Sequence, residues 1–141
     1  AWDACLGPQR RALLADLGAL ALRLGFGLTM AFAHGWGKLS TFSEKSASFP
    51  DPLGVSSPVS LGMTVFAEFF CSLALVAGLC TRLAAIPLMI AMGTAFFVIH
   101  GADPFQKKEL AFLYLIVYTA ILLLGPGRFS VDHEIAERLR K

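Results

Sequence analysis

The sequence predicts an all-α protein, a transmembrane four-helix bundle with both termini cytoplasmic and a short C-terminal surface helix. Hydrophobic residues make up 56% of the chain and charged residues only 16%, which is far more apolar than a soluble domain of this length requires. The apolar residues fall into four runs of about 20 residues, the length that crosses a hydrocarbon core of about 30 Å. Turn and capping residues separate these runs, so we expect one membrane domain over residues 1–141.

The first predicted span covers residues 17–37. Leu13 and Leu17 extend the helical spacing toward the N-terminus, so the helix should begin before the bilayer. Trp36 marks the outer end, because an amphipathic indole ring favours the membrane interface. The loop at residues 40–57 is rich in Ser and Pro but also contains apolar side chains. We therefore expect it to fold back over the bundle end, as a lid or as a tethered cover.

Capping signals mark the next two spans. Ser57-Pro58 combines an N-cap residue with a first-turn proline, so the second span is predicted over residues 58–80. A tight turn at Gly78 then leads into a third span over residues 82–100.

The fourth span is predicted over residues 104–124. Asp103-Pro104 repeats the start signal, and Gly125-Pro126-Gly127 ends the run. A tail helix over residues 131–140 carries Val131 and further apolar residues on one side, so it should lie on the membrane surface or on the bundle.

Basic residues predict the orientation. Four spans put both termini on one side, and that side carries seven basic residues: Arg10, Arg11, Arg82, Arg128, Arg138, Arg140 and Lys141. The opposite side carries four: Lys38, Lys45, Lys107 and Lys108. The positive-inside rule then places the termini in the cytoplasm. The net charge of +2 and the lack of a basic patch with aromatics indicate no nucleic-acid partner.

Charged residues within the spans are candidates for function, because a charge in the bilayer is costly. Arg23 and Glu68 are predicted at a similar depth, and we expect them to form an ion pair. This pair would either lock two helices together or form part of a polar site. Thr64, Glu68 and Ser72 recur every fourth residue, which favours a glutamate that faces a cavity.

Further candidates are expected near the outer end of the bundle. His34 and Lys38 continue the helix face of Arg23, and His100 ends the third span. The two histidines could donate to an oxygen of a shared ligand or simply be interfacial polar residues. A bis-His haem, or a copper site that includes Met30, is a lesser alternative.

Two other groups of residues, the tyrosines of the fourth span and the cysteines, could belong to a site or to the core. Tyr114 and Tyr118 are one turn apart in the fourth span and should face the bundle, either as core or as the wall of an aromatic pocket. Cys5, Cys71 and Cys80 lack the spacing of a metal site, so we expect buried free thiols. No residue pattern identifies a catalytic group or a resident metal.

Four stretches, in this order, resemble the DoxX family of small four-helix bacterial membrane proteins: Arg23-Leu24-Gly25, His34-Gly35-Trp36-Gly37-Lys38-Leu39, Ala67-Glu68-Phe69 and Gly78-Leu79-Cys80-Thr81-Arg82. The likeness covers about residues 17–128. It implies a transmembrane bundle and a link to quinone-coupled oxidation, notably as a subunit of a thiosulfate:quinone oxidoreductase. It also draws attention to Arg23, His34, Lys38 and Glu68.

The leading hypothesis is therefore an inner-membrane subunit of a quinone-linked redox system, an oxidoreductase component with other membrane or redox subunits as partners. It would bind a quinone head near the outer end of the bundle, without a covalent cofactor. The ligand-binding candidates are Arg23, His34, Lys38, Glu68, His100 and Tyr114. The alternative is a non-enzymatic assembly or scaffold subunit of a larger membrane complex.

Overall fold

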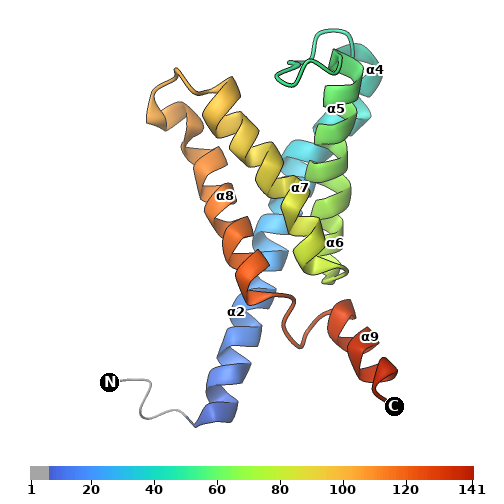
Figure 1. Cartoon of the computed structure of the whole chain (residues 1–141), viewed down its shortest axis with the longest axis vertical. Helices are drawn as coiled ribbons and strands as arrows, with labels where there is room; N and C mark the ends of the chain where they lie inside the picture. Colours follow the sequence, from blue (N-terminus) through green and yellow to red (C-terminus); the bar gives the residue numbers. More distant parts are fainter. Residues whose placement is uncertain (1–6) are drawn as a thin grey trace.

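The computed structural model describes residues 7–141, and this part of the chain is all-helical, as predicted (Figure 1). Three helical segments are long and apolar enough to cross a membrane: Pro8–Ser40, Ser57–Ala77 and Thr81–Ile99. We call them the first, second and third segments. The chain is therefore a membrane protein with several apolar helices.

The first segment is continuous and longer than the predicted span of residues 17–37. It consists of α2 (Pro8–Thr29), the π-helical turn η1 (Met30–Gly35) and α3 (Trp36–Ser40). A proline in the first turn starts it, where a missing N–H costs nothing. Because the helix continues past residue 37, Lys38 has a helical position from which it can face the second segment.

The second and third segments also contain π-helical turns. The second consists of α5 (Ser57–Val65), η2 (Phe66–Cys71) and α6 (Ser72–Ala77), and the third of α7 (Thr81–Thr94) and η3 (Ala95–Ile99). Such turns insert an extra residue into a helix and are frequent at functional sites. Here η2 and η3 both contribute to the cavity described below.

Two further helices complete the described chain. They are α8 (Phe105–Leu124) and α9 (Val131–Leu139), while the short α4 (Phe42–Lys45) lies in the loop after the first segment. α8 packs most extensively against α7, with Tyr114 and Tyr118 buried. Its first turns carry three charged residues, Lys107, Lys108 and Glu109, and it is not among the candidate spans.

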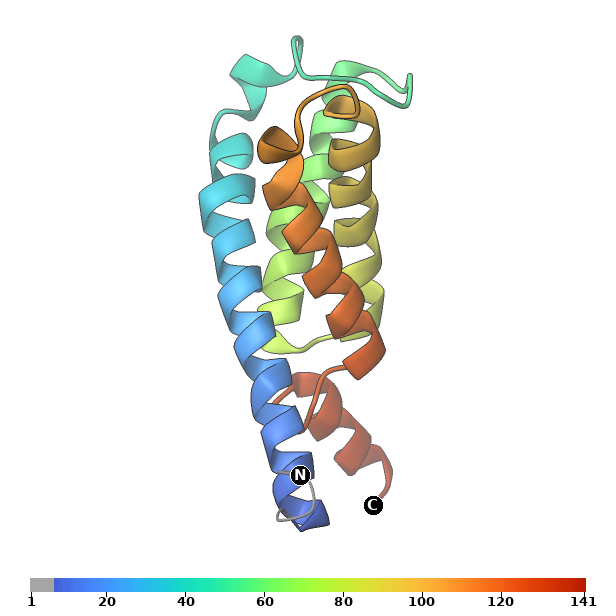
Figure 2. The ribbon, with the colours of Figure 1, turned by 90° about the vertical axis from the view of Figure 1, so that its left-hand side faces the viewer.

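The long helices lie side by side (Figure 2). The start of α2 and α9 lie at one end of the molecule, and the loop between α4 and α5 lies at the other (Figure 1). The third segment contacts α6 and η2 but diverges from α5 toward the loop end (Figure 1). This divergence leaves space between the second and third segments.

Glycines bring the first and second segments into backbone contact. A Cβ added to Gly35 would lie 2.7 Å from the carbonyl carbon of Glu68 and 2.7 Å from the nitrogen of Phe69. A Cβ added to Gly27 would lie 3.1 Å from the carbonyl oxygen of Ser72. Small residues of this kind let helix backbones approach closely in membranes. Gly35 is therefore level with Glu68, and Gly27 with the start of α6.

We expect Gly35→Ala to lower the free energy of unfolding by about 1–3 kcal/mol, since the added methyl group would press on backbone that cannot rotate away. Gly37→Ala is the matched control, because a Cβ at Gly37 meets nothing within 4 Å. Thermal unfolding of both variants in detergent would measure the difference. Equal melting temperatures for the two variants would contradict the close contact.

Candidate functional site

A cavity of about 700 Å³ lies between the second and third segments, at the loop end of the molecule. Most of its wall is apolar and comes from the α4–α5 loop, α5, η2, α7 and η3: Phe49, Pro50, Pro52, Leu53, Gly62, Met63, Phe66, Ala67, Pro87, Ile90, Ala91, Ala95 and Ile99. Its polar residues are Lys38, Ser60, Thr64, Glu68, Thr94 and His100. A concave, mostly apolar site with a few polar groups is typical of small-molecule binding.

Lys38 and Glu68 form an ion pair on the cavity wall. The Nζ atom of Lys38 lies 2.5 Å from Oε2 of Glu68, and the glutamate is only 6% exposed. The two residues meet because Gly35, at the end of η1 and one turn before Lys38, brings η1 against η2. Each charge neutralises the other, so removal of either one would leave an uncompensated charge.

His100 lies at the end of η3, where its imidazole is paired with Asp103. The Nδ1 atom of His100 is 2.8 Å from Oδ2 of Asp103. This hydrogen bond, together with the positive charges of Lys107 and Lys108, holds the pKa of Asp103 below its ordinary value. An ionised carboxylate only accepts hydrogen bonds, so Nδ1 is the donor of this pair.

The loop between α4 and α5 covers the cavity and is fixed by Asp51. Its Oδ1 atom accepts hydrogen bonds from the hydroxyl of Ser60 at 2.7 Å and from the nitrogen of Val55 at 3.0 Å. Its Oδ2 atom accepts from the nitrogen of Ser56 at 2.8 Å. The bond from Ser60, followed by those from the backbone, lowers the pKa of Asp51. The loop thus folds back over the bundle end, as the sequence predicted.

His34 and Tyr114, two of the predicted candidates, are not among the residues that line this cavity. Their rings pack edge to face with centroids 5.9 Å apart. Tyr114 is 3% exposed and also contacts Phe26 and Tyr118. Of the two histidines considered as ligand partners, only His100 belongs to the cavity wall.

Arg23 is buried at the opposite end of the molecule and binds backbone carbonyls. Nε donates to Leu75 at 2.9 Å, and Nη2 donates to Val76 at 3.2 Å and to Phe129 at 3.0 Å. Nη1 donates to the carbonyl of Pro126. The guanidinium therefore joins the first segment to the end of α6 and to the chain before α9.

The predicted Arg23–Glu68 ion pair is wrong, because Glu68 pairs with Lys38. The error came from the assumed end of the first helix. We placed His34 at the outer rim, but the helix continues to Ser40, and its contacts put Gly35 at the level of Glu68. Arg23, three turns earlier, then lies beside the α6–α7 turn, where a Cβ on Gly78 would approach its guanidinium to 2.8 Å.

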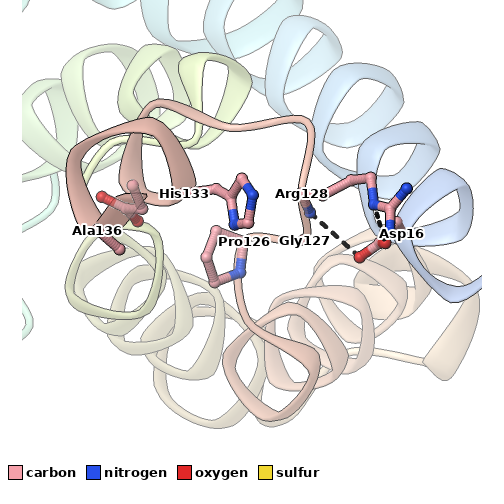
Figure 3. Close-up of a pocket in the computed structure, with 7 residues that line it drawn as sticks. Asp16, Pro126, Gly127, Arg128, His133 and Ala136 are labelled. Carbon is pink, nitrogen blue, oxygen red and sulfur yellow. Dashed lines mark hydrogen bonds and ion pairs between the residues drawn. The ribbon is translucent and has the colours of Figure 1, made fainter. Parts of the chain in front are cut away.

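A second, open pocket of about 400 Å³ lies beside α9 (Figure 3). Its charged groups are already engaged. Nε of Arg128 lies 3.0 Å from Oδ2 of Asp16, and the carboxylate of Asp132 accepts from the nitrogens of Cys80 at 2.7 Å and Thr81 at 2.8 Å. These contacts attach the C-terminal chain to the bundle, so we assign the pocket a structural role.

The cysteines differ in their surroundings. Cys71 is buried, as expected, but Cys80 is exposed, because it lies in the α6–α7 turn with a φ of 46°. Both are free thiols, and Cys5 lies outside the described residues. Within residues 7–141, no three His, Cys, Asp or Glu side chains form a group that could hold a metal ion.

Sequence reasoning missed Asp51 and assigned Asp103 only a capping role. Both aspartates precede a proline shortly before a helix, as Asp51-Pro52 and Asp103-Pro104. This shared dipeptide is the sequence signal for a carboxylate that organises the loop before a helix. Their individual partners, Ser60 and His100, follow from the folded loops.

We expect Arg23→Lys to lower the free energy of unfolding by about 2–4 kcal/mol, because a single ammonium cannot reach the separate carbonyls bound by the guanidinium fork. Chemical unfolding in detergent would measure this loss, and limited proteolysis should show earlier cleavage before α9. Arg138→Lys, at an exposed pair with Glu134, is the matched control and should change stability by less than about 0.5 kcal/mol. Equal effects of the two substitutions would contradict the role of Arg23.

The loop over the cavity should loosen in acid. The pKa of Asp51 is lower in the folded chain than in the unfolded chain, so its stabilising effect is complete above the ordinary carboxyl pKa of about 4 and disappears as the pH falls through the folded value. Amide hydrogen exchange at Val55 and Ser56, corrected for intrinsic rates, should accelerate over that range.

In Asp51→Asn, exchange at these two amides should be fast already at neutral pH and should lose its acid dependence. Glu44→Gln, an exposed carboxylate change in α4, is the control and should keep the original profile. A pH profile in Asp51→Asn like that of the unchanged protein would argue against Asp51 as the group that fixes the loop.

The comparisons with known proteins identify one family. The family model described as DoxX matches residues 18–101, more than half of the chain. This range begins in α2, ends just after η3, and includes Lys38, Glu68 and His100. No curated protein and no solved structure matches the chain.

Proposed function

The chain belongs to the DoxX family, and from this premise we propose that it is an integral membrane subunit of a quinone-linked redox system. In this proposal, the cavity between the second and third segments binds the quinone head. The observation that supports it best is the placement of Lys38, Glu68 and His100 on the wall of an otherwise apolar cavity. The other expected ligand groups, Arg23, His34 and Tyr114, would support the bundle instead.

The proposal places the cavity within the bilayer, near its outer surface. Much of its wall belongs to two candidate membrane spans, Ser57–Ala77 and Thr81–Ile99, so a lipophilic molecule could enter from the lipid. The covering loop would limit access of water. Apolar residues would then contact the ring and tail, while Lys38 would donate a hydrogen bond to a ring oxygen.

The same proposal includes four spans with cytoplasmic termini in a bacterial inner membrane. α8 would be the fourth span, because Leu110–Leu124 is free of charged residues and the helix packs along α7. Its charged first turn would lie at the outer surface. The position of Arg23 beside the α6–α7 turn adds a basic residue to the cytoplasmic side, in keeping with the positive-inside rule.

The proposed protein would act with other membrane or redox subunits. The quinone would be a bound substrate, and its electrons would be exchanged with a partner subunit. A scaffold function is the alternative, in which Arg23 only holds parts of the chain together through its bonds to backbone carbonyls. Purification in mild detergent, followed by extraction of bound quinone and identification of partners, would distinguish a quinone-binding subunit from a scaffold. Stoichiometric partners without quinone would favour the scaffold.

We expect Gly62→Leu to weaken the binding of a decyl-substituted benzoquinone by at least about tenfold, because the new side chain would occupy the cavity that the ring needs. A Cβ at Gly62 meets nothing within 4 Å, so the substitution should leave the backbone in place. Calorimetric titration of the purified protein would measure the affinity.

Gly25→Leu is the matched control, because a Cβ there also meets nothing within 4 Å and the residue is remote from the cavity. Its affinity should equal that of the unchanged protein. Binding that is unaffected by Gly62→Leu, or absent in the unchanged protein, would refute this site.

A further inference from the structure

The polar wall of the cavity has more free acceptors than free donors. The hydroxyl of Ser60 donates its hydrogen to Asp51 at 2.7 Å, and that of Thr64 donates to the carbonyl of Ser60 at 2.8 Å. A hydroxyl has one hydrogen but two lone pairs. Toward a ligand, both side chains therefore act as acceptors.

His100 also offers an acceptor. Its Nδ1–H donates to the carboxylate of Asp103, so in the neutral imidazole Nε2 carries no hydrogen. Asp103 thereby fixes the tautomer, as carboxylates do for many functional histidines. The residue was expected to donate to a ligand oxygen, but the Asp103 contact reverses that role.

The ion pair adds one hydrogen-bond acceptor, Glu68, and one donor, Lys38. Glu68 is a carboxylate whose Oε2 already accepts from Lys38, and its remaining lone pairs can only accept. Lys38 retains ammonium hydrogens that can donate. Thr94, whose hydroxyl has no partner in the part of the chain described, can do either. Lys38 is thus the one charged donor on a wall that holds several acceptors.

We propose that the cavity selects a head group with free hydroxyls, the hydroquinone form, over the corresponding quinone. A quinone oxygen can only accept, so it competes for Lys38 and Thr94. A hydroquinone oxygen can accept from Lys38 and also donate to Glu68 or to His100. This inference rests on the proposed function and specifies which redox form the site holds.

Three decyl-substituted compounds test the proposal: a hydroquinone, its dimethyl ether and the quinone. Each would be titrated anaerobically into the full chain at pH 8, with correction for partition into detergent. The hydroquinone should bind about tenfold more tightly than the quinone, the equivalent of one net hydrogen bond. The dimethyl ether, which has no hydroxyl, should bind no better than the quinone.

The outcomes separate the inference from the function on which it rests. A quinone that binds as tightly as the hydroquinone, or an ether that matches the hydroquinone, overturns the selectivity while the quinone-site proposal stands. If none of the three compounds binds, the proposed function fails, and the selectivity fails with it.

A substitution then tests the part played by His100. In His100→Gln, the amide can donate to a quinone as readily as it accepts from a hydroxyl, so the tenfold preference should fall to about threefold or less. His133→Gln makes the same chemical change in α9, remote from the cavity, and should keep the full preference. If His100→Gln keeps the full preference for hydroquinone over quinone, His100 does not contribute to the selectivity. Should that variant fail to fold, the three-compound comparison on the unchanged protein still decides the proposal.

Discussion

The backbone contact between the first and second segments at Gly35 is the constraint on which the rest of the arrangement depends. It sets the antiparallel register of the two helices, because a side chain at Gly35 would occupy the position of the Glu68 backbone. With that register, Lys38 reaches Glu68 and Arg23 lies beside the α6–α7 turn. One contact between helix backbones thus decides where two of the buried charges find their partners.

The buried charges are compensated in two different ways. Arg23 donates to carbonyls of α6 and of the chain before α9, which uses most of the guanidinium's hydrogens. Lys38 and Glu68 compensate each other and retain hydrogens and lone pairs that face a cavity. A charged group whose hydrogen-bonding capacity is largely used stabilises the fold, whereas a pair with free hydrogens and lone pairs can also bind a ligand. This difference separates the structural end of the molecule from the candidate site.

The cavity itself is a product of helix divergence and loop chemistry. The third segment packs on α6 and η2 but leaves α5 toward the loop end, so the space between them widens there (Figure 1). Asp51 fixes the loop over this space by accepting hydrogen bonds from Ser60 and from two backbone nitrogens. The wall is therefore mostly apolar, with Lys38, Glu68 and His100 as its charged or ionisable residues.

The sequence alone determined the class of the protein and the local starts of its helices, because apolar runs and capping residues act over a few residues. Pro58 lies in the first turn of α5 as predicted, although Ser57 is the first helical residue and Ser56, not Ser57, is the N-cap. Ser130 accepts a hydrogen bond from the nitrogen of His133 at the start of α9, and the DoxX resemblance is confirmed by the family match. Only the tertiary structure decided which charges meet. The partner of Glu68 depends on how far the first helix extends and on where two backbones touch, and residue counting from assumed membrane boundaries cannot supply either distance.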